Sequence, residues 1–82
     1  MLEFKPGIYR NEQRQFFNMI QVLSHVEYDE EQVLFEKANG EKALLKFESF
    51  VQHVKNDALV YLDNQERALE LFKMNRSAAK FM

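Results

Sequence analysis

Two short apolar runs bounded by charged residues lie in the middle of the chain, and the pattern there predicts two strands joined by a tight turn. Asn39 and Gly40 separate the two runs. Both residue types tolerate a positive φ, which a two-residue type I′ turn requires at each of its central positions. We therefore expect a β-hairpin with strands near 31–38 and 41–47.

Residues 16–28 carry a pattern that fits two secondary structures. Apolar residues at helical spacing, with Asn11 as a candidate N-cap, allow an amphipathic helix. Several of the same residues are β-branched, and an acidic turn follows them, so the segment also fits a strand. We favour the strand. A turn centred on residues 29–30 would then place Val26 opposite Val33.

The resulting three-strand meander is expected to be apolar on both of its faces. In the predicted register Phe35 lies opposite Leu44, and Leu34 lies opposite Leu45. One face would hold Ile20, Val22, Val26, Val33, Phe35 and Leu44. The other face would hold Met19, Leu23, Leu34, Leu45 and Phe47. A sheet with two apolar faces must curl on itself or be covered on both sides.

The second half of the chain supplies helices for that cover. A short helix is expected over residues 49–55, and a longer one is expected to begin after Asp63 and to run to about residue 79. Asp63 and Glu66 have the spacing of a capping box. Residues 58–62 fit either a fourth strand or the first turns of the longer helix, and we favour the helix. The expected inward-facing residues are Phe50, Val51 and Val54 in the short helix and Ala68, Leu69, Phe72 and Ala79 in the long one.

The sequence thus predicts one α+β domain over residues 1–82. It would be mainly β through residue 48 and mainly α from residue 49. The predicted architecture is an antiparallel meander of three to four strands, followed by one short and one longer C-terminal helix.

Four short motifs follow one another in an order that resembles a known family. They are Pro6-Gly7-Ile8-Tyr9-Arg10, Val33-Leu34-Phe35, Asn39-Gly40 and Phe47-Glu48-Ser49-Phe50-Val51. Over residues 6–54 they resemble a family of small SH3-like barrel domains from bacteria and phages that has no assigned function. Asn11 stands where the family has His, Phe35 where it has Tyr, and Lys46-Phe47 where it has Arg-Pro. The resemblance implies a curled, SH3-like sheet and no particular activity.

Composition narrows the classes of function. The chain has no cysteine and only two glycines, and its formal net charge is −2. Without cysteine it can form neither a disulfide framework nor a thiolate metal site, and with two glycines it lacks a phosphate-cradling loop. No serine lies in a glycine-flanked nucleophile elbow. We therefore expect a cytoplasmic, non-enzymatic protein with no cofactor and no membrane segment.

One alternating set of potential ligands could form a metal site. His25, Glu27 and Asp29 would share one face of a strand. Because two of them flank a surface turn, we expect no metal there. The second histidine, His53, is expected to face solvent from the short helix.

Two kinds of surface remain as candidate binding sites. The acidic set, with two neighbouring aromatic residues, would bind a protein partner and consists of Glu27, Asp29, Glu30, Glu31, Phe16 and Phe17. The basic set would contact phosphate or nucleic acid and consists of Arg10, Arg14, Lys73, Arg76 and Lys80. Charged side chains of this kind more often only keep a surface solvated.

Together these features predict a small interaction or regulatory protein that binds a protein partner, such as a phage or mobile-element accessory protein. Eight phenylalanines in so short a chain also favour a homodimer, because a small core cannot hide them all. The alternatives are a nucleic-acid-associated module, which the weakly acidic net charge disfavours, and a protein that binds or sequesters a small ligand such as a nucleotide.

Overall fold

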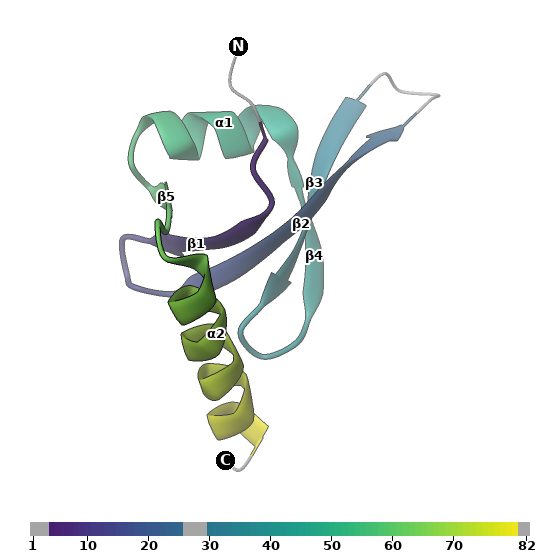
Figure 1. Cartoon of the computed structure of the whole chain (residues 1–82). Helices are drawn as coiled ribbons and strands as arrows, with labels where there is room; N and C mark the ends of the chain where they lie inside the picture. The colour runs from purple at the N-terminus through teal and green to yellow at the C-terminus, as the bar shows by residue number, and fades with distance from the viewer. Residues whose placement is uncertain (1–3, 26–29, 81–82) are drawn as a thin grey trace.

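The computed structural model describes residues 4–25 and 30–80. Within these residues five antiparallel strands form one sheet, and two helices pack against it (Figure 1). The elements are β1 (Gly7–Asn11), β2 (Phe16–His25), β3 (Glu30–Lys37), β4 (Lys42–Lys46), α1 (Phe47–Lys55), β5 (Leu59–Tyr61) and α2 (Gln65–Lys80). The sheet order is β4-β3-β2-β1-β5, so the last strand pairs with the first.

The predicted α+β class is confirmed, but the number of strands and the order of the helices differ from the prediction. The sheet has five strands, and the short helix precedes the last strand. The helix favoured for residues 58–62 is wrong. Leu59 is buried, and β5 pairs with β1 through Asn11 and Leu59. The free edge of β1 thus gains a backbone partner, which local periodicity does not reveal.

The strand favoured for residues 16–28 is confirmed over Phe16–His25 as β2, but its predicted register is wrong. Val22, not Val26, lies opposite Val33, and Val26 itself is outside the described residues. A β-bulge between Met19 and Gln21 adds one residue to β2. Because of the bulge, Met19 and Val22 both pack into one core, although strict alternation would place them on opposite faces.

The hairpin around Asn39-Gly40 is present, but its turn is not type I′. Gly40 has a positive φ of 92°, whereas Asn39 does not have a positive φ. Gly40 N–H donates to Lys37 O (2.9 Å), and Lys37 N–H donates to Glu41 O (2.8 Å), which encloses a three-residue loop. The longer loop shifts the predicted pairing by one residue.

The shift moves every side chain of β4 to the other face of the sheet. Leu44 lies opposite Leu34, and Leu45 lies opposite Val33. Leu45 therefore shares a face with Val33, in place of the predicted Leu44.

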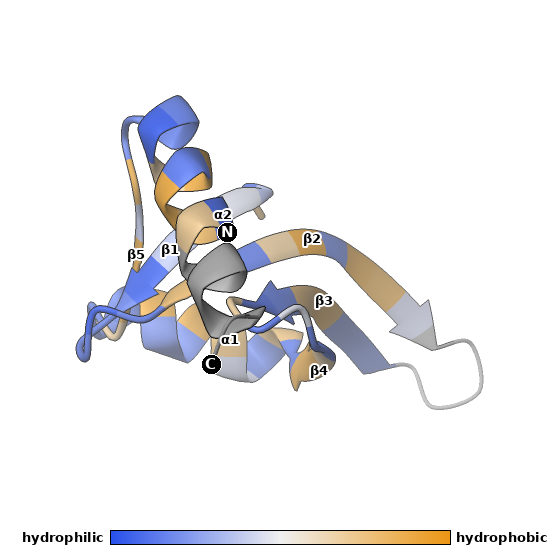
Figure 2. Cartoon of the chain, turned by 90° about the horizontal axis from the view of Figure 1, so that it is seen from below, coloured by the Kyte–Doolittle hydropathy of each residue, from blue (hydrophilic) through white to orange (hydrophobic). Residues whose placement is uncertain are grey.

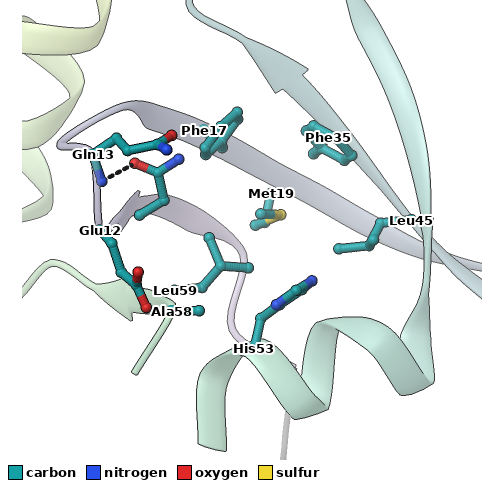
Figure 3. Close-up of a pocket in the computed structure, with 10 residues that line it drawn as sticks. Glu12, Gln13, Phe17, Met19, Phe35, Leu45, His53, Ala58 and Leu59 are labelled. Atoms are coloured by element: carbon teal, nitrogen blue, oxygen red, sulfur yellow. Dashed lines mark hydrogen bonds between the residues drawn. The ribbon is translucent and has the colours of Figure 1, made fainter. Parts of the chain in front are cut away.

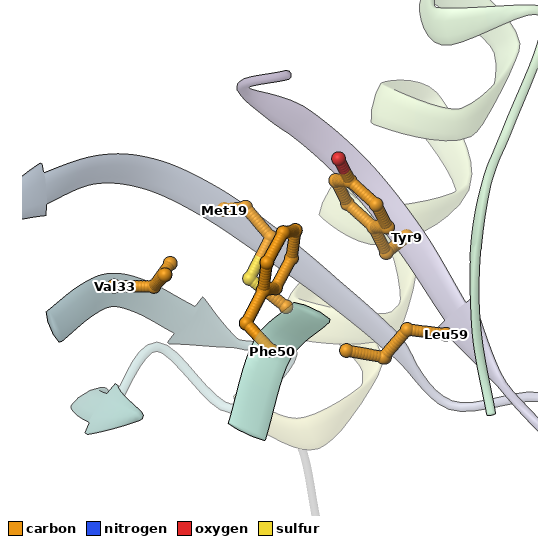
Figure 4. Packing of buried hydrophobic residues seen from close by; sticks show 5 residues of the cluster. All are labelled: Tyr9, Met19, Val33, Phe50 and Leu59. Atoms are coloured by element: carbon orange, nitrogen blue, oxygen red, sulfur yellow. The ribbon is translucent and has the colours of Figure 1, made fainter. Parts of the chain in front are cut away.

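The inner face of the curled sheet holds the main core (Figure 4). Its buried residues are Tyr9, Met19, Val33, Phe50 and Leu59. Phe50 of α1 is 0% exposed, and its ring lies 5.4 Å from the Tyr9 ring and 5.6 Å from the Phe4 ring, measured between centroids. Val51 and Val54 pack against the same cluster, which confirms the predicted apolar face of α1.

A second, smaller core lies on the outer face under α2. Ala68 and Phe72 pack against Ile8 of β1, and Phe16 is half-buried beside them. Leu69, which was predicted to face inward, is 40% exposed. The two helices thus cover opposite faces of the sheet, as the apolar character of both faces predicted (Figure 2).

The start of α2 is tied to β1 by one glutamine. The α2 cap is Asn64, whose Oδ1 accepts a bond from Arg67 N–H (3.1 Å), so the predicted cap at Asp63 is displaced by one residue. Gln65 Oε1 accepts from Ile8 N–H (2.7 Å), and Gln65 Nε2 donates to Ile8 O (3.1 Å). The side-chain amide thereby adds to the backbone bonding at the end of β5, where Leu62 N–H also donates to Ile8 O (3.2 Å). Gly7 lies against this amide with φ 140°.

We predict that Gly7→Ala lowers the free energy of unfolding by about 2 kcal/mol, measured by urea denaturation. A Cβ at this position would lie 2.5 Å from Gln65 Oε1, on a backbone conformation that only glycine readily adopts. In the Gln65→Ala background the same change should have a smaller effect, because the clash is gone. An unchanged urea midpoint for Gly7→Ala alone would contradict this account.

Candidate functional site

One cavity lies where the curled sheet fails to close. β4 and β5 are the two edge strands, and the hollow between them, the seam cavity, has a volume of about 330 Å³ (Figure 3). Leu45 of β4 lines one side and Leu59 of β5 the other, and strands β2 and β3 form the floor. Phe50 fills the neighbouring part of the same inner face, so the cavity begins where that packing ends.

The floor of the seam cavity is apolar because of the β2 bulge and the β3–β4 register. Phe17 and Met19 of β2 and Phe35 of β3 line it, and the rings of Phe17 and Phe35 meet edge to face at 5.8 Å. Phe17 and Phe35 are only half-buried, although apolar side chains surround them. A guest group inside the cavity would therefore remove aromatic surface from water.

One rim is the turn between β1 and β2, which Asn11 stabilises. Asn11 Oδ1 accepts bonds from Gln13 N–H (3.0 Å) and Gln15 N–H (2.8 Å), and its Nδ2 donates to Gln15 Oε1 (2.8 Å). Such Asx interactions order a turn that contains a residue with positive φ, here Arg14 at 63°. The turn holds Glu12 and Gln13 at the mouth of the cavity. Asn11 therefore caps this turn and not the helix considered as an alternative.

The C-terminal end of α1 forms a second part of the rim, next to this turn. Ala58 N–H donates to His53 O (2.8 Å), and Asp57 N–H donates to Val54 O (3.2 Å). This is the Schellman arrangement of a helix end, with Asp57 in the left-handed position at φ 59°. The bonds place Ala58 and the exposed side chain of His53 beside the cavity. His53 is exposed as predicted, but its place on the rim escaped the sequence analysis.

The seam cavity has an apolar floor and a polar rim. Among the described residues no group of three His, Cys, Asp or Glu side chains could hold a metal ion. Burial raises the pKa of the Tyr9 phenol, which donates to Lys5 O (2.8 Å), so Tyr9 is neutral at physiological pH and serves the core. The side chain of His25 and residues 27 and 29, considered as metal ligands, lie outside the described part of the chain.

The predicted basic and aromatic residues come together only in part. Arg14, Phe16 and Phe17 line a second hollow of about 570 Å³, where they meet Lys37 and Asn39 from the β3–β4 hairpin. Arg10 is not among its lining residues, and its Nη1 donates to Asn11 O (3.4 Å). Lys73 is exposed on α2, and the side chains of Arg76 and Lys80 are outside the described set.

The predicted acidic set is not gathered into one patch by the described residues. Glu30 and Glu31 lie at the start of β3, where Glu30 Oε1 is 3.6 Å from Lys46 Nζ. Glu41 lies at the other end of β3, with its Oε2 4.0 Å from Lys37 Nζ. Glu27 and Asp29 fall outside the described residues. Phe16 is held under α2, and Phe17 separates the two hollows.

Comparison of the chain with protein-family models, with curated proteins and with solved structures finds no match in any of the three. In the described residues no helix is long and apolar enough to cross a membrane.

The left-handed backbone of Asp57 at the end of α1 should lower the stability of the protein. A residue with a Cβ is strained in the left-handed position, and glycine is not. Asp57→Gly should therefore raise the free energy of unfolding by about 0.5–1 kcal/mol, measured by thermal denaturation. Asp57→Ala should lower it, because alanine adopts the left-handed conformation less readily than aspartate does. A destabilised Asp57→Gly variant would show that the Schellman end does not limit stability.

Proposed function

We propose that this protein is a small, non-enzymatic interaction module that takes an apolar side chain of a protein partner into the seam cavity. The observation that carries the proposal is the apolar floor at an open edge of the sheet, formed by Phe17, Met19, Phe35, Leu45 and Leu59. A side chain that covers this floor would remove aromatic and aliphatic surface from water, which makes the free energy of binding more favourable.

The surroundings of the cavity favour a polypeptide over a free small molecule. Its volume of about 330 Å³ is at the lower end of the range for small-molecule sites, roughly 300–1,000 Å³. That volume suits one large side chain. The strand edge of β4 beside it offers backbone groups to an extended segment, a recurrent mode of peptide recognition.

The topology supports an SH3-like architecture for the module, as the resemblance of residues 6–54 implies. A helix separates β4 from β5, β5 returns to pair with β1, and the sheet curls around Phe50. The family has no assigned activity, so the function proposed here rests on the cavity alone.

The proposal is tested by selecting peptides on the wild-type protein and then comparing their binding to a variant whose cavity is filled. Random twelve-residue peptides are displayed and selected on the wild-type protein, and enriched sequences are synthesised and titrated by fluorescence anisotropy. Ala58→Trp should weaken their binding by more than about tenfold, because the indole occupies the cavity at its rim. Leu69→Ala, an exposed site on α2, is the matched control and should leave affinity unchanged.

Heteronuclear NMR spectra are recorded first, to check that both variants keep the wild-type fold. Enriched peptides that bind Ala58→Trp as tightly as wild type would refute the proposal. Selection that yields no binding sequence, with tight binding of an oligonucleotide that weakens steeply with salt, would favour the nucleic-acid alternative instead.

A further inference from the structure

Strand β4 has one bonded side and one open side in the described part of the chain. The bond from Lys37 N–H to Glu41 O fixes the alternation of the β3–β4 ladder, so Ala43 and Leu45 bond to β3. The backbone N–H and C=O groups of Lys42 and Leu44 therefore point away from β3. They form an open edge next to the seam cavity.

The side chains of β4 alternate between the cavity and the outer face. Leu45 lines the seam cavity. Leu44 points to the outer face and is 54% exposed. Lys42 and Lys46 lie on the same outer face as Leu44 and are exposed, one at each end of the strand.

The charges at the ends of β4 decide which strand it can accept. If two copies paired antiparallel about Leu44, Lys42 of each would lie opposite Lys46 of the other, and like charges in such pairs are destabilising. A second copy is therefore disfavoured at this edge. A segment with acidic residues at the same two positions is favoured. The Glu30 carboxylate near Lys46 does not prevent this, because that pair is 41% and 66% exposed and weak.

We propose, building on the function proposed above, that the partner binds as an additional antiparallel strand along β4 and that its core sequence is acidic, apolar, apolar, any residue, acidic. The first acidic side chain lies beside Lys46 and the last beside Lys42. The second residue lies beside Leu45 and enters the seam cavity. The third lies opposite Leu44 and covers it on the outer face.

The pairing geometry supports this order. Residues opposite Leu44 and Lys42 exchange backbone bonds with them, whereas the residue opposite Leu45 forms a non-bonded pair, in which side chains approach most closely. The side chain that must enter the cavity is thus the one that β4 holds nearest to Leu45.

The experiment uses three labelled peptides with the centres Glu-Leu-Val-Thr-Glu, Lys-Leu-Val-Thr-Lys and Glu-Thr-Val-Leu-Glu. Anisotropy titrations at about 0.05 M and 0.5 M NaCl compare their affinities for the full chain. The acidic peptide should bind at least about fivefold more tightly than the basic and the reversed peptides at low salt. Its advantage over the basic peptide should shrink at high salt.

Charge reversal supplies the matched control. Lys42→Glu should lower affinity for the acidic peptide and raise it for the basic one by about fivefold each, whereas Lys73→Glu on α2 should change neither. Hydrogen exchange should show new protection of the Leu44 and Lys42 amides when the acidic peptide is bound.

The outcomes separate this inference from the proposed function. If the selected peptides depend on Ala58 but the Leu44 and Lys42 amides stay unprotected and Lys42→Glu has no effect, the cavity proposal stands and strand addition is wrong. Equal affinity for all three peptides, or no binding by the acidic one, also overturns strand addition. Peptides that protect the β4 amides but bind Ala58→Trp normally would overturn the cavity proposal instead.

Discussion

The packing of Phe50 between α1 and the curled sheet is the interaction on which the rest of the structure depends. Its ring is 0% exposed and contacts aromatic rings from the N-terminal segment, β1 and the start of α1. Full burial of a side chain of this size contributes roughly 1.5–3 kcal/mol, a large share of the stability of a small domain. It also holds α1 across one end of the inner face. The other end is left unfilled, and that space is the seam cavity.

Two local irregularities determine which side chains surround that space. The bulge between Met19 and Gln21 allows Met19 and Val22 to face the same core. The three-residue loop after Lys37 turns Leu45 inward and leaves Leu44 on the outer face. If one of these irregularities were absent, the side chains of that strand would point to the opposite faces of the sheet. A different set of side chains would then meet Phe50. The composition of the cavity is therefore a consequence of backbone geometry as much as of residue type.

Two hydrogen-bonded rims and an open strand edge border the seam cavity. The Asn11 turn and the Schellman end of α1 hold the two rims by backbone and side-chain bonds. On the other side of the cavity, β4 presents backbone groups, an inward leucine and two terminal lysines. If a partner binds there as we propose, rims that are already hydrogen-bonded would lose little conformational entropy. The lysines disfavour pairing between copies of the same strand and, under the proposed strand addition, would favour an acidic segment.

Elements with local signals could be predicted from residue type and spacing alone. The Asn39-Gly40 reversal, the β2 strand and the apolar face of α1 are all visible in residue type and spacing, and the two apolar faces of the sheet required cover on both sides. The registers, the pairing of β5 with β1 and the seam cavity depend on contacts across the whole fold. A register depends on loop length and on bulges, and these are chosen by the packing of the whole core. β5 is a strand because the edge of β1 lies beside it, and His53 reaches the cavity because the chain folds back at Asp57. Contacts between residues so far apart in the chain leave no periodic trace in the sequence, and for that reason the site emerged only from the fold.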